Sequence, residues 1–251
     1  MRIKFKIVAI NYFLFTSIFP LFSKAQNGEN IYLSVKYKLV AFYKEKQTVN
    51  DSCVLNISKT YSYFYSLGKQ EADAKSFEEF KKTKIFTSKF SCKNCFPYVF
   101  FKEYTKNRVY RVQPLMGVYY AFDQPSTNNI NWTLTKDSLT INGINCFKAL
   151  GKIDTVTYTV FYAPTIPISD GPSILAGLPG LIVKSESSSG LKIKITSLEY
   201  LNQFSEENKY SSNFQFTTYQ KFKAAEIAMK ETLESGKEVQ MSNGATIKRI
   251  N

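Results

Sequence analysis

The stretch DSLTINGINCFK, residues 137–148, decides the fold class of this 251-residue chain. Its centre, Asn142-Gly143, lies between two isoleucines. This is the strongest short-range signal of a two-residue β-hairpin, because both turn residues must adopt positive φ. Such a loop places residue 141 opposite 144, residue 139 opposite 146 and residue 137 opposite 148. The first two pairs are apolar and the third joins Asp137 to Lys148, so the register is self-consistent and predicts antiparallel strands.

The same period-two alternation, rich in Tyr, Phe, Val, Ile and Thr, runs through most of the chain and indicates half-buried strands. Strands are predicted at residues 31–39, 53–57, 61–65, 98–104, 108–112, 118–122, 132–134, 139–141, 144–149, 157–162, 181–185 and 191–197. Helices are predicted at 70–82 and 218–235, where apolar residues recur with helical spacing. We therefore expect a mainly β fold: an antiparallel curved sheet or half-barrel with one or two helices.

The first 25 residues have the three-part order of a secretory signal peptide. Basic residues at 2, 4 and 6 precede an apolar run over 7–22, and Ser23-Lys24-Ala25 supplies small residues at the cleavage position. Asn11 and Pro20 interrupt the run, which is shorter than the roughly 20 apolar residues of a membrane-spanning helix. We expect cleavage after Ala25 rather than an uncleaved anchor. The mature chain, residues 26–251, is then a single domain without a transmembrane segment.

The charge balance is basic. Removing residues 1–25 takes away four of the 33 basic residues and none of the 20 acidic ones, which leaves 29 against 20 and a net charge of +9. The lysines are scattered, and many alternate with apolar residues, as at 191–195, which is typical of the solvent face of a strand. Without a basic cluster, this pattern argues against nucleic-acid binding and leaves an unspecific attraction to surface anions such as lipopolysaccharide.

The chain contains no histidine. This excludes Ser-His-Asp and Cys-His catalysis and removes the commonest zinc and copper ligand. We expect a non-enzymatic protein without metal or cofactor. An enzyme would have to rely on carboxylates or on a Ser-Lys arrangement.

Two blocks rich in proline and glycine follow: IPISDGP over 166–172 and GLPGLI over 177–182. In the second, Pro179 fixes φ at the first central position of a turn and Gly180 accepts the positive φ of the next. In the first, the Asp170 side chain can cap the backbone of a Gly171-Pro172 turn. Neither block holds a nucleophile–base pair or a metal-ligand cluster, so a rigid structural turn is the simplest interpretation. The alternative is an exposed loop that forms the lip of a binding groove. The candidate residues for that role are Pro167, Asp170, Gly171, Pro172, Gly177, Leu178, Pro179, Gly180, Leu181 and Ile182.

These blocks resemble the motif that gives its name to the GLPGLI family, small exported proteins of the Bacteroidetes. The resemblance extends to YFYS at 63–66, to Trp132, and to an I-x-G-x-x-C-x-K-A pattern over 141–149. Two departures stand out. Gly151-Lys152 and the strand FYA at 161–163 replace a Gly-Arg pair and a Trp-Tyr-Thr-like strand, and SIL at 173–175 replaces the aromatic residue after the GP turn. The resemblance implies an accessory role in TonB-dependent outer-membrane transport.

We therefore expect an exported cell-envelope protein, periplasmic or associated with the outer membrane, that binds an apolar ligand or a protein partner such as an outer-membrane transport protein. An aromatic content of 16% supplies material for both a core and an apolar groove. A curled sheet with a helix is loosely similar to periplasmic lipoprotein-carrier folds, an analogy at the level of the fold. Two alternatives stay open: a histidine-free hydrolase that uses Asp170, and a purely structural envelope component.

Four cysteines in an exported chain indicate disulfides. Cys92-Lys93-Asn94-Cys95 has the spacing of a thioredoxin-like redox motif, but such a motif needs a helix that begins at the first cysteine, and the following residues are predicted as a strand. We expect a local structural disulfide between Cys92 and Cys95, with a redox motif as the alternative. Cys53 and Cys146 stand alone, which excludes a CxxC–CxxC zinc site, and by elimination they pair with each other.

Overall fold

The computed structural model describes residues 32–44, 46–83, 91–115, 118–124, 130–201, 214–235, 239–240 and 246–247. The expected signal peptide lies outside the described residues, so its cleavage stays a prediction. Within the described part of the chain, none of the helices combines the length and the apolar character needed to cross a membrane.

The fold is mainly β, as expected. One sheet of twelve strands has the order β12-β6-β5-β4-β3-β2-β1-β11-β10-β9-β8-β7. Its strands are β1 (Leu33–Tyr43), β2 (Lys46–Ile57), β3 (Tyr61–Ser66), β4 (Val99–Glu103), β5 (Arg108–Leu115), β6 (Val118–Asp123), β7 (Thr133–Ile141), β8 (Ile144–Ile153), β9 (Val156–Ala163), β10 (Leu181–Ser187), β11 (Leu191–Tyr200) and β12 (Phe214–Phe216). Neighbours are antiparallel except β12, which pairs with β6 in parallel. The remaining elements are the helices α2 (Leu67–Thr83) and α3 (Tyr219–Glu234), and the short pair β13 (Val239–Gln240) and β14 (Thr246–Ile247).

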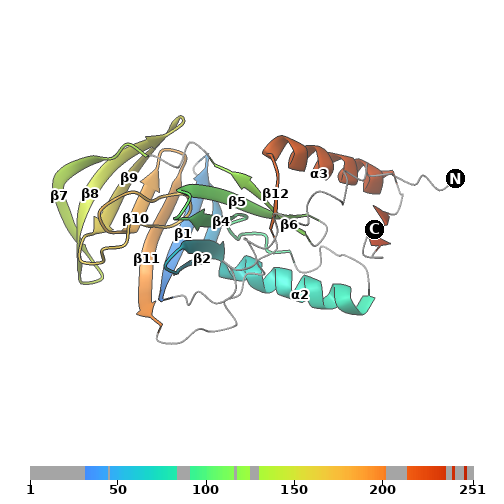
Figure 1. The fold of residues 1–251 in the computed structure, drawn as a ribbon, viewed down its shortest axis with the longest axis horizontal. Coiled ribbons are helices and arrows are strands. Elements are labelled where there is room, and N and C mark those ends of the chain that lie inside the picture. The colour runs from blue at the N-terminus through green and yellow to red at the C-terminus, as the bar shows by residue number, and fades with distance from the viewer. Residues whose placement is uncertain are drawn as a thin grey trace.

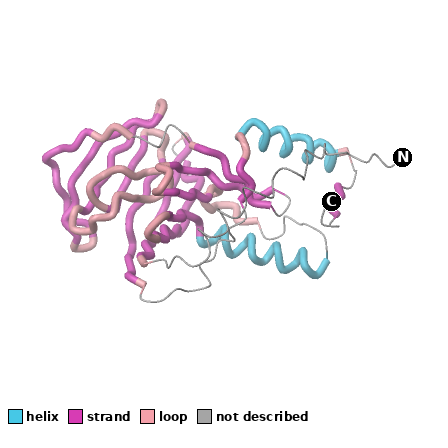
Figure 2. The backbone as a smooth tube through the Cα atoms, viewed as in Figure 1, coloured by secondary structure: helices cyan, strands magenta, loops and turns pink. Residues whose placement is uncertain are grey.

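Figure 1 shows the sheet curling from β7, β8 and β9 at one end to β5, β6 and β12 at the other, where both helices lie. Figure 2 shows how much of the chain is strand. The long segment between β9 and β10, residues 164–180, leaves the sheet and crosses toward β4 and β5 (Figure 1). This segment contains both motif blocks.

The predicted hairpin is confirmed in its turn and in the register of its first two pairs, whereas Asp137 lies in a bulge and has no Cα partner on the neighbouring strand. Ile141 pairs with Ile144 and Leu139 with Cys146, and Asn142 and Gly143 both have positive φ, at 49° and 79°. The expected opposite-charge pair also forms, with Lys148 Nζ 2.9 Å from Asp137 Oδ2.

Several strands extend beyond their predicted bounds, and β12, β13 and β14 were not predicted; the differences at β2, β7 and α2 have a clear physical reason. β2 begins at Lys46 rather than at residue 53. The sequence does not predict its first half because these residues are polar and exposed and lack the alternation of a half-buried strand. β7 is one strand rather than two, and a β-bulge between Leu134 and Ser138 breaks its alternation. α2 begins three residues earlier than expected, where the Ser66 hydroxyl accepts a hydrogen bond from the Lys69 N–H at 2.9 Å and caps the helix.

Strand alternation divides the buried side chains into clusters on the two faces of the sheet. The main core draws on β1–β5 and β7–β11, with Tyr37, Phe64 and Phe100 among its aromatic members. A second, aromatic cluster lies on the opposite face of β2–β6 and includes Tyr63 and Phe101, whose rings stack at 4.9 Å. A third cluster packs the motif segment against β8 and β9. α3 covers the β5–β6 end through Phe222, whose ring contacts Phe122 at 5.1 Å.

Candidate functional site

A buried ion pair fastens the motif segment to the far half of the sheet. Lys102 comes from β4 and Asp170 from the segment between β9 and β10, and their exposed fractions are 2% and 1%. The Lys102 ammonium donates to Asp170 Oδ1, to the Gly171 carbonyl and to the Leu175 carbonyl, the last at 2.8 Å. All three of its N–H donors are therefore used on one short stretch of chain.

The Asp170 carboxylate is also fully engaged. Besides Lys102, its Oδ1 accepts from the Gly171 N–H at 2.6 Å, and its Oδ2 accepts from the Tyr104 hydroxyl. The expected local cap, a hydrogen bond from the Gly171 N–H to the Asp170 carboxylate, is thus present. The same carboxylate also binds the Lys102 ammonium and the Tyr104 hydroxyl, which come from a distant part of the chain. Nearby, the Tyr37 hydroxyl of β1 donates to the Ile182 carbonyl at 2.8 Å.

The electrostatics of this cluster follow from its burial. Burial lowers the pKa of the Lys102 ammonium, and the Asp170 charge opposes that shift. Burial raises the pKa of the Tyr104 hydroxyl, and the charge and hydrogen bond of Asp170 raise it further. The pKa of Tyr37 is raised for the same two reasons, burial first and Asp170 second. Both phenols therefore stay protonated and act as hydrogen-bond donors.

This arrangement favours a structural role for Asp170 over the hydrolase alternative. A general acid or base must reach the proton that it transfers in a plausible substrate pose. Asp170 is 1% exposed and both of its oxygens accept hydrogen bonds from within the protein. What the cluster can do is hold residues 164–180 against β4, which five other strands separate from β9 in the sheet order.

The GLPGLI turn differs in detail from the predicted one. Gly180 does have positive φ, at 152°, and a Cβ there would collide with the Ala163 carbonyl, so the requirement for glycine is confirmed. The turn, however, closes with a Gly180 N–H bond to the Leu178 carbonyl at 2.8 Å, not with one from Leu181. The Leu181 N–H, at the start of β10, instead donates to the Ile166 carbonyl at 3.0 Å.

Most of the other motif candidates are buried rather than arranged around a groove. Pro167, Gly177 and Pro179 are exposed, whereas the remaining seven are buried. Trp132 packs over this segment, and its indole N–H donates to the Ala176 carbonyl at 2.8 Å. A Cβ at Gly151 would lie 2.6 Å from the same ring. The motif, the conspicuous Trp132 and Gly151 therefore form one packed unit.

The cysteine prediction is half right. Cys92 and Cys95 form a disulfide, with their Cα atoms 5.6 Å apart. Cys53 and Cys146 are both buried and free, so the pairing proposed for them is wrong. The physical reason is topology: β2 and β8 are separated by four strands in the sheet order, and a disulfide requires Cα atoms within about 7 Å. In the described residues no group of His, Cys, Asp or Glu could hold a metal ion.

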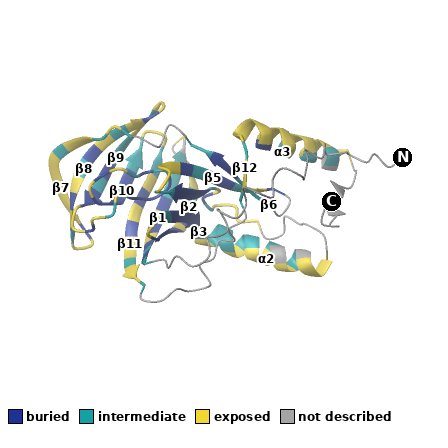
Figure 3. Ribbon diagram, viewed as in Figure 1, coloured by how far each residue is buried: buried dark blue, intermediate teal, exposed yellow. Residues whose placement is uncertain are grey.

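A second candidate surface lies at the end of the sheet, on β7 and β8. Four large apolar side chains are exposed there: Leu134 (55%), Leu139 (44%), Phe147 (41%) and Leu150 (41%). Figure 3 shows β7 as largely exposed. In the sheet order of the described residues β7 is the last strand and pairs only with β8. We call these four residues the β7 edge.

The β7 edge is apolar on both faces of the sheet. Leu139 lies opposite Cys146, a member of the main core, and Leu150 shares that face because it is four residues along β8 from Cys146. Leu134 lies opposite Ala149, a member of the third cluster, and Phe147 shares this second face. Exposed apolar side chains therefore continue both buried clusters at this end of the sheet, on β7 and β8.

Comparison with known proteins supports the fold alone. No family model and no curated protein matches the chain. Two crystal forms of PNGF-II are similar to it, each with a TM-score of 0.54 and 15% identity, over 76% and 78% of this chain and 32% and 33% of theirs. This chain therefore spans about a third of the PNGF-II chain.

Two further structures are similar at a lower level. An outer membrane lipoprotein-sorting protein domain from Vibrio parahaemolyticus has a TM-score of 0.29 and 7% identity, over 75% of this chain and 93% of its own. A LolA superfamily protein from Nitrosomonas europaea has a TM-score of 0.29 and 6% identity, over 75% and 96%. At this level the likeness carries no conclusion about function.

Proposed function

We propose that this protein is an exported cell-envelope binding protein of the GLPGLI type, not an enzyme, whose partner is an extended segment of another protein. The β7 edge carries this proposal, because it leaves apolar side chains exposed on both faces of the sheet. The partner class that the family resemblance favours is an outer-membrane transport protein, with this chain as its accessory.

Exposure on two faces selects the chemistry of the partner. A lipid or another apolar small molecule would cover one face of a sheet. An added strand covers both, because its side chains alternate between the faces as those of β7 do. Leu139 on one face and Leu134 on the other would then be buried beside the added strand, and its longer side chains would reach Leu150 and Phe147 on the neighbouring β8.

The backbone of β7 supports the same partner. An edge strand presents unpaired N–H and C=O groups along one side, and an extended peptide can pair with them. β7 is nine residues long and mostly exposed, and on the C-terminal side of its bulge residues 138–141 offer a regular ladder. Its central bulge contains Lys136 and Asp137, and charges at a bulge are a common protection against unspecific edge pairing.

The test is site-specific photo-crosslinking in the cell that makes the protein. A photoreactive residue at position 134 or 139 should crosslink to one defined segment of a polypeptide. The control is position 227 in α3, where Ile227 is similarly exposed at 47% but lies far from β7 in the fold (Figure 1). A synthetic peptide of the captured segment should then slow hydrogen exchange of the β7 amides.

The alternatives give different outcomes. Crosslinks from 134 and 139 to lipid, without peptide, would replace the protein partner by an apolar ligand. Crosslinks from neither position would favour a purely structural envelope component. Binding of the peptide should weaken at least tenfold in Leu134→Lys/Leu139→Lys, which places a charge on each face of the edge; unchanged binding would contradict pairing at β7.

A further inference from the structure

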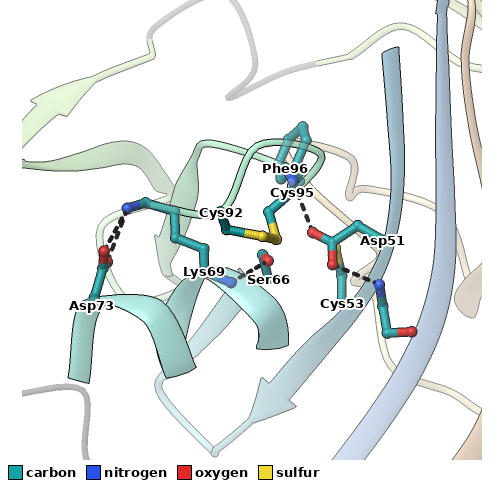
Figure 4. The surroundings of a disulfide bond; sticks show 9 residues. Asp51, Cys53, Ser66, Lys69, Asp73, Cys92, Cys95 and Phe96 are labelled. Atoms are coloured by element: carbon teal, nitrogen blue, oxygen red, sulfur yellow. Dashed lines mark hydrogen bonds and ion pairs between the residues drawn. A yellow bond between two sulfur atoms is a disulfide. The ribbon is translucent and has the colours of Figure 1, made fainter. Parts of the chain in front are cut away.

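The Cys92–Cys95 disulfide lies against the first turn of α2 (Figure 4). A Cβ added to Gly68, the second residue of α2, would be 2.6 Å from Cys95 Sγ and 3.4 Å from Cys92 Sγ. Glycine is therefore required for this close approach, and Cys95 is the nearer of the two sulfurs. Cys92 is exposed, whereas Cys95 is half-buried.

The sequence argued against a redox motif because no helix is predicted to begin at Cys92. The geometry of the disulfide answers this argument. No helix begins at Cys92, since residues 96–98 are irregular and β4 follows. A helix N-terminus is supplied instead by α2, from a different part of the chain. The N-terminus of a helix carries roughly half a positive charge and stabilises a nearby anion such as a thiolate.

The cysteine loop is held in place by two contacts with β2. The Phe96 N–H donates to Asp51 Oδ2 at 2.7 Å, and the Asn50 N–H donates to the Asn94 carbonyl at 3.2 Å. Because these contacts do not involve the sulfurs, the loop can keep its position when the disulfide opens.

From this geometry we infer that Cys92–Cys95 is a thiol–disulfide exchange site for a dithiol substrate, in which Cys92 is attacked and Cys95 is the leaving thiolate. A substrate thiolate attacks the exposed Cys92 Sγ and forms a mixed disulfide. The Cys92–Cys95 bond breaks, and its electron pair goes to Cys95 Sγ at the α2 N-terminus. The second substrate thiolate then attacks the substrate sulfur of the mixed disulfide and releases Cys92 as a thiolate.

The balance of this exchange is two electrons. The substrate dithiol is oxidised to a disulfide, the cysteine pair is reduced to two thiols, and the two protons of the substrate end on the two cysteines or in solvent according to their pKa values. A leaving thiolate of lower pKa leaves faster, which is why contact between Cys95 and the helix terminus matters. This inference stands on the disulfide alone and does not depend on the β7 edge.

One charged group near the sulfurs, the Asp51 carboxylate, partly opposes the stabilisation of a thiolate by the α2 N-terminus. The Asp51 carboxylate comes within 3.7 Å of the same added Cβ on Gly68, but two backbone N–H groups, those of Ser52 and Phe96, donate to it. On α2, Lys69 pairs with Asp73 at 2.9 Å, and Lys93 lies exposed between the two cysteines.

The free thiol of Cys53 lies next to Asp51 on β2 (Figure 4). Its Sγ is 3.8 Å from Asp51 Oδ2. Burial raises the pKa of this thiol, and the Asp51 charge adds to the shift. Cys53 therefore stays protonated and does not compete with the substrate thiolate.

The first test is equilibration of the folded mature protein with mixtures of reduced and oxidised glutathione. The Cys92–Cys95 bond should open reversibly with no change in circular dichroism, and Cys95→Ser should trap glutathione on Cys92 at least tenfold faster than Cys92→Ser traps it on Cys95. In Cys92→Ser, the pKa of the Cys95 thiol should lie about one unit below the usual ~8.5. A disulfide that resists glutathione in the folded protein, as structural disulfides do, would overturn the inference.

The second test isolates the helix terminus with a matched pair of variants. Leu67 is the first residue of α2 and is 37% exposed. Leu67→Glu places a negative charge at the first turn, and Leu67→Gln adds the same volume without charge. The Glu variant should raise the Cys95 pKa and slow reduction several-fold relative to the Gln variant. Equal values in the two would show that charge at the α2 N-terminus does not act on Cys95 and would contradict the mechanism.

Discussion

Lys102→Met is the sharpest perturbation that the structure offers, because methionine keeps most of the side-chain volume and removes the charge. Three acceptors lose their donor at once: the Asp170 carboxylate and the carbonyls of Gly171 and Leu175. Asp170 is then a carboxylate at 1% exposure without its cation. The segment 164–180 loses its ionic link to β4.

The magnitude follows from burial. Breaking one side of a buried ion pair costs about 3–5 kcal/mol, against a total stability of about 5–15 kcal/mol for a domain. Asp170→Asn should cost less, about 1–3 kcal/mol, because the amide oxygen still accepts a hydrogen bond. In that variant Lys102, whose pKa burial already lowers, can also release its proton. From sequence alone Asp170 is a local cap worth about 1 kcal/mol, so Asp170→Ala now has a larger expected cost.

The assay is urea unfolding of the mature protein, followed by circular dichroism and analysed by linear extrapolation. The double variant Lys102→Met/Asp170→Asn should be more stable than the sum of the single changes predicts, by about 1–3 kcal/mol, because the two groups interact directly. Lys194→Met in β11 is the control: this lysine is exposed, and the change should stay within about 0.5 kcal/mol. If Lys102→Met costs no more than this control, the ion pair does not hold the motif segment and our account of it is wrong.

Three further predictions follow from other parts of the fold. Gly180→Val should cost several kcal/mol or prevent folding, because φ is 152° and a Cβ would meet the Ala163 carbonyl; an unchanged melting temperature would contradict this. Alkylation of the oxidised protein should label no thiol in the folded state and two after denaturation, since Cys53 and Cys146 are free and buried; a count of zero would restore their pairing. Stability should fall as pH rises above about 9, because the unfolded chain releases protons that burial retains in the folded state on Cys53, Tyr37, Tyr63 and Tyr104. These pKa values are raised on folding, so the stability that they contribute is complete below the unfolded pKa values and is lost progressively as the pH rises from there through the folded ones. The lowered pKa of Lys102 acts in the opposite sense. Urea midpoints at pH 8 and pH 11 would measure the difference.

The elements that the sequence predicted well are those whose signal is local. The Asn142-Gly143 turn sets the register of β7 and β8 through the backbone of two residues, and the alternating strands follow from their own side chains. The first half of β2 escaped prediction because both of its faces are mostly exposed. The Cys53–Cys146 pairing failed because elimination assumes that every cysteine is oxidised, whereas the sheet order keeps β2 and β8 apart.

The ion pair could not be predicted from either of its local contexts. Lys102 and Asp170 are 68 residues apart. The alternation of β4 does not indicate which acidic residue pairs with Lys102. One signal was available. Lys102 shares a strand face with Phe100, which belongs to the main core, and a lysine on a buried face requires a compensating acid. Asp170, the acidic residue inside the motif region, is the natural candidate, but sequence alone does not exclude the others.

The structure also changes what the GLPGLI blocks explain. Their glycines and their aspartate are required for packing: Gly180 for its approach to Ala163, and Asp170 for Lys102. Packing therefore accounts for the buried residues of the motif, whereas Pro167, Gly177 and Pro179 stay exposed. The proposed binding site and the proposed exchange site both lie outside the motif: one at the β7 edge, which is apolar on both faces, and one where α2 meets Cys95. A change at either place should alter function while the motif segment, and with it the fold, stays intact.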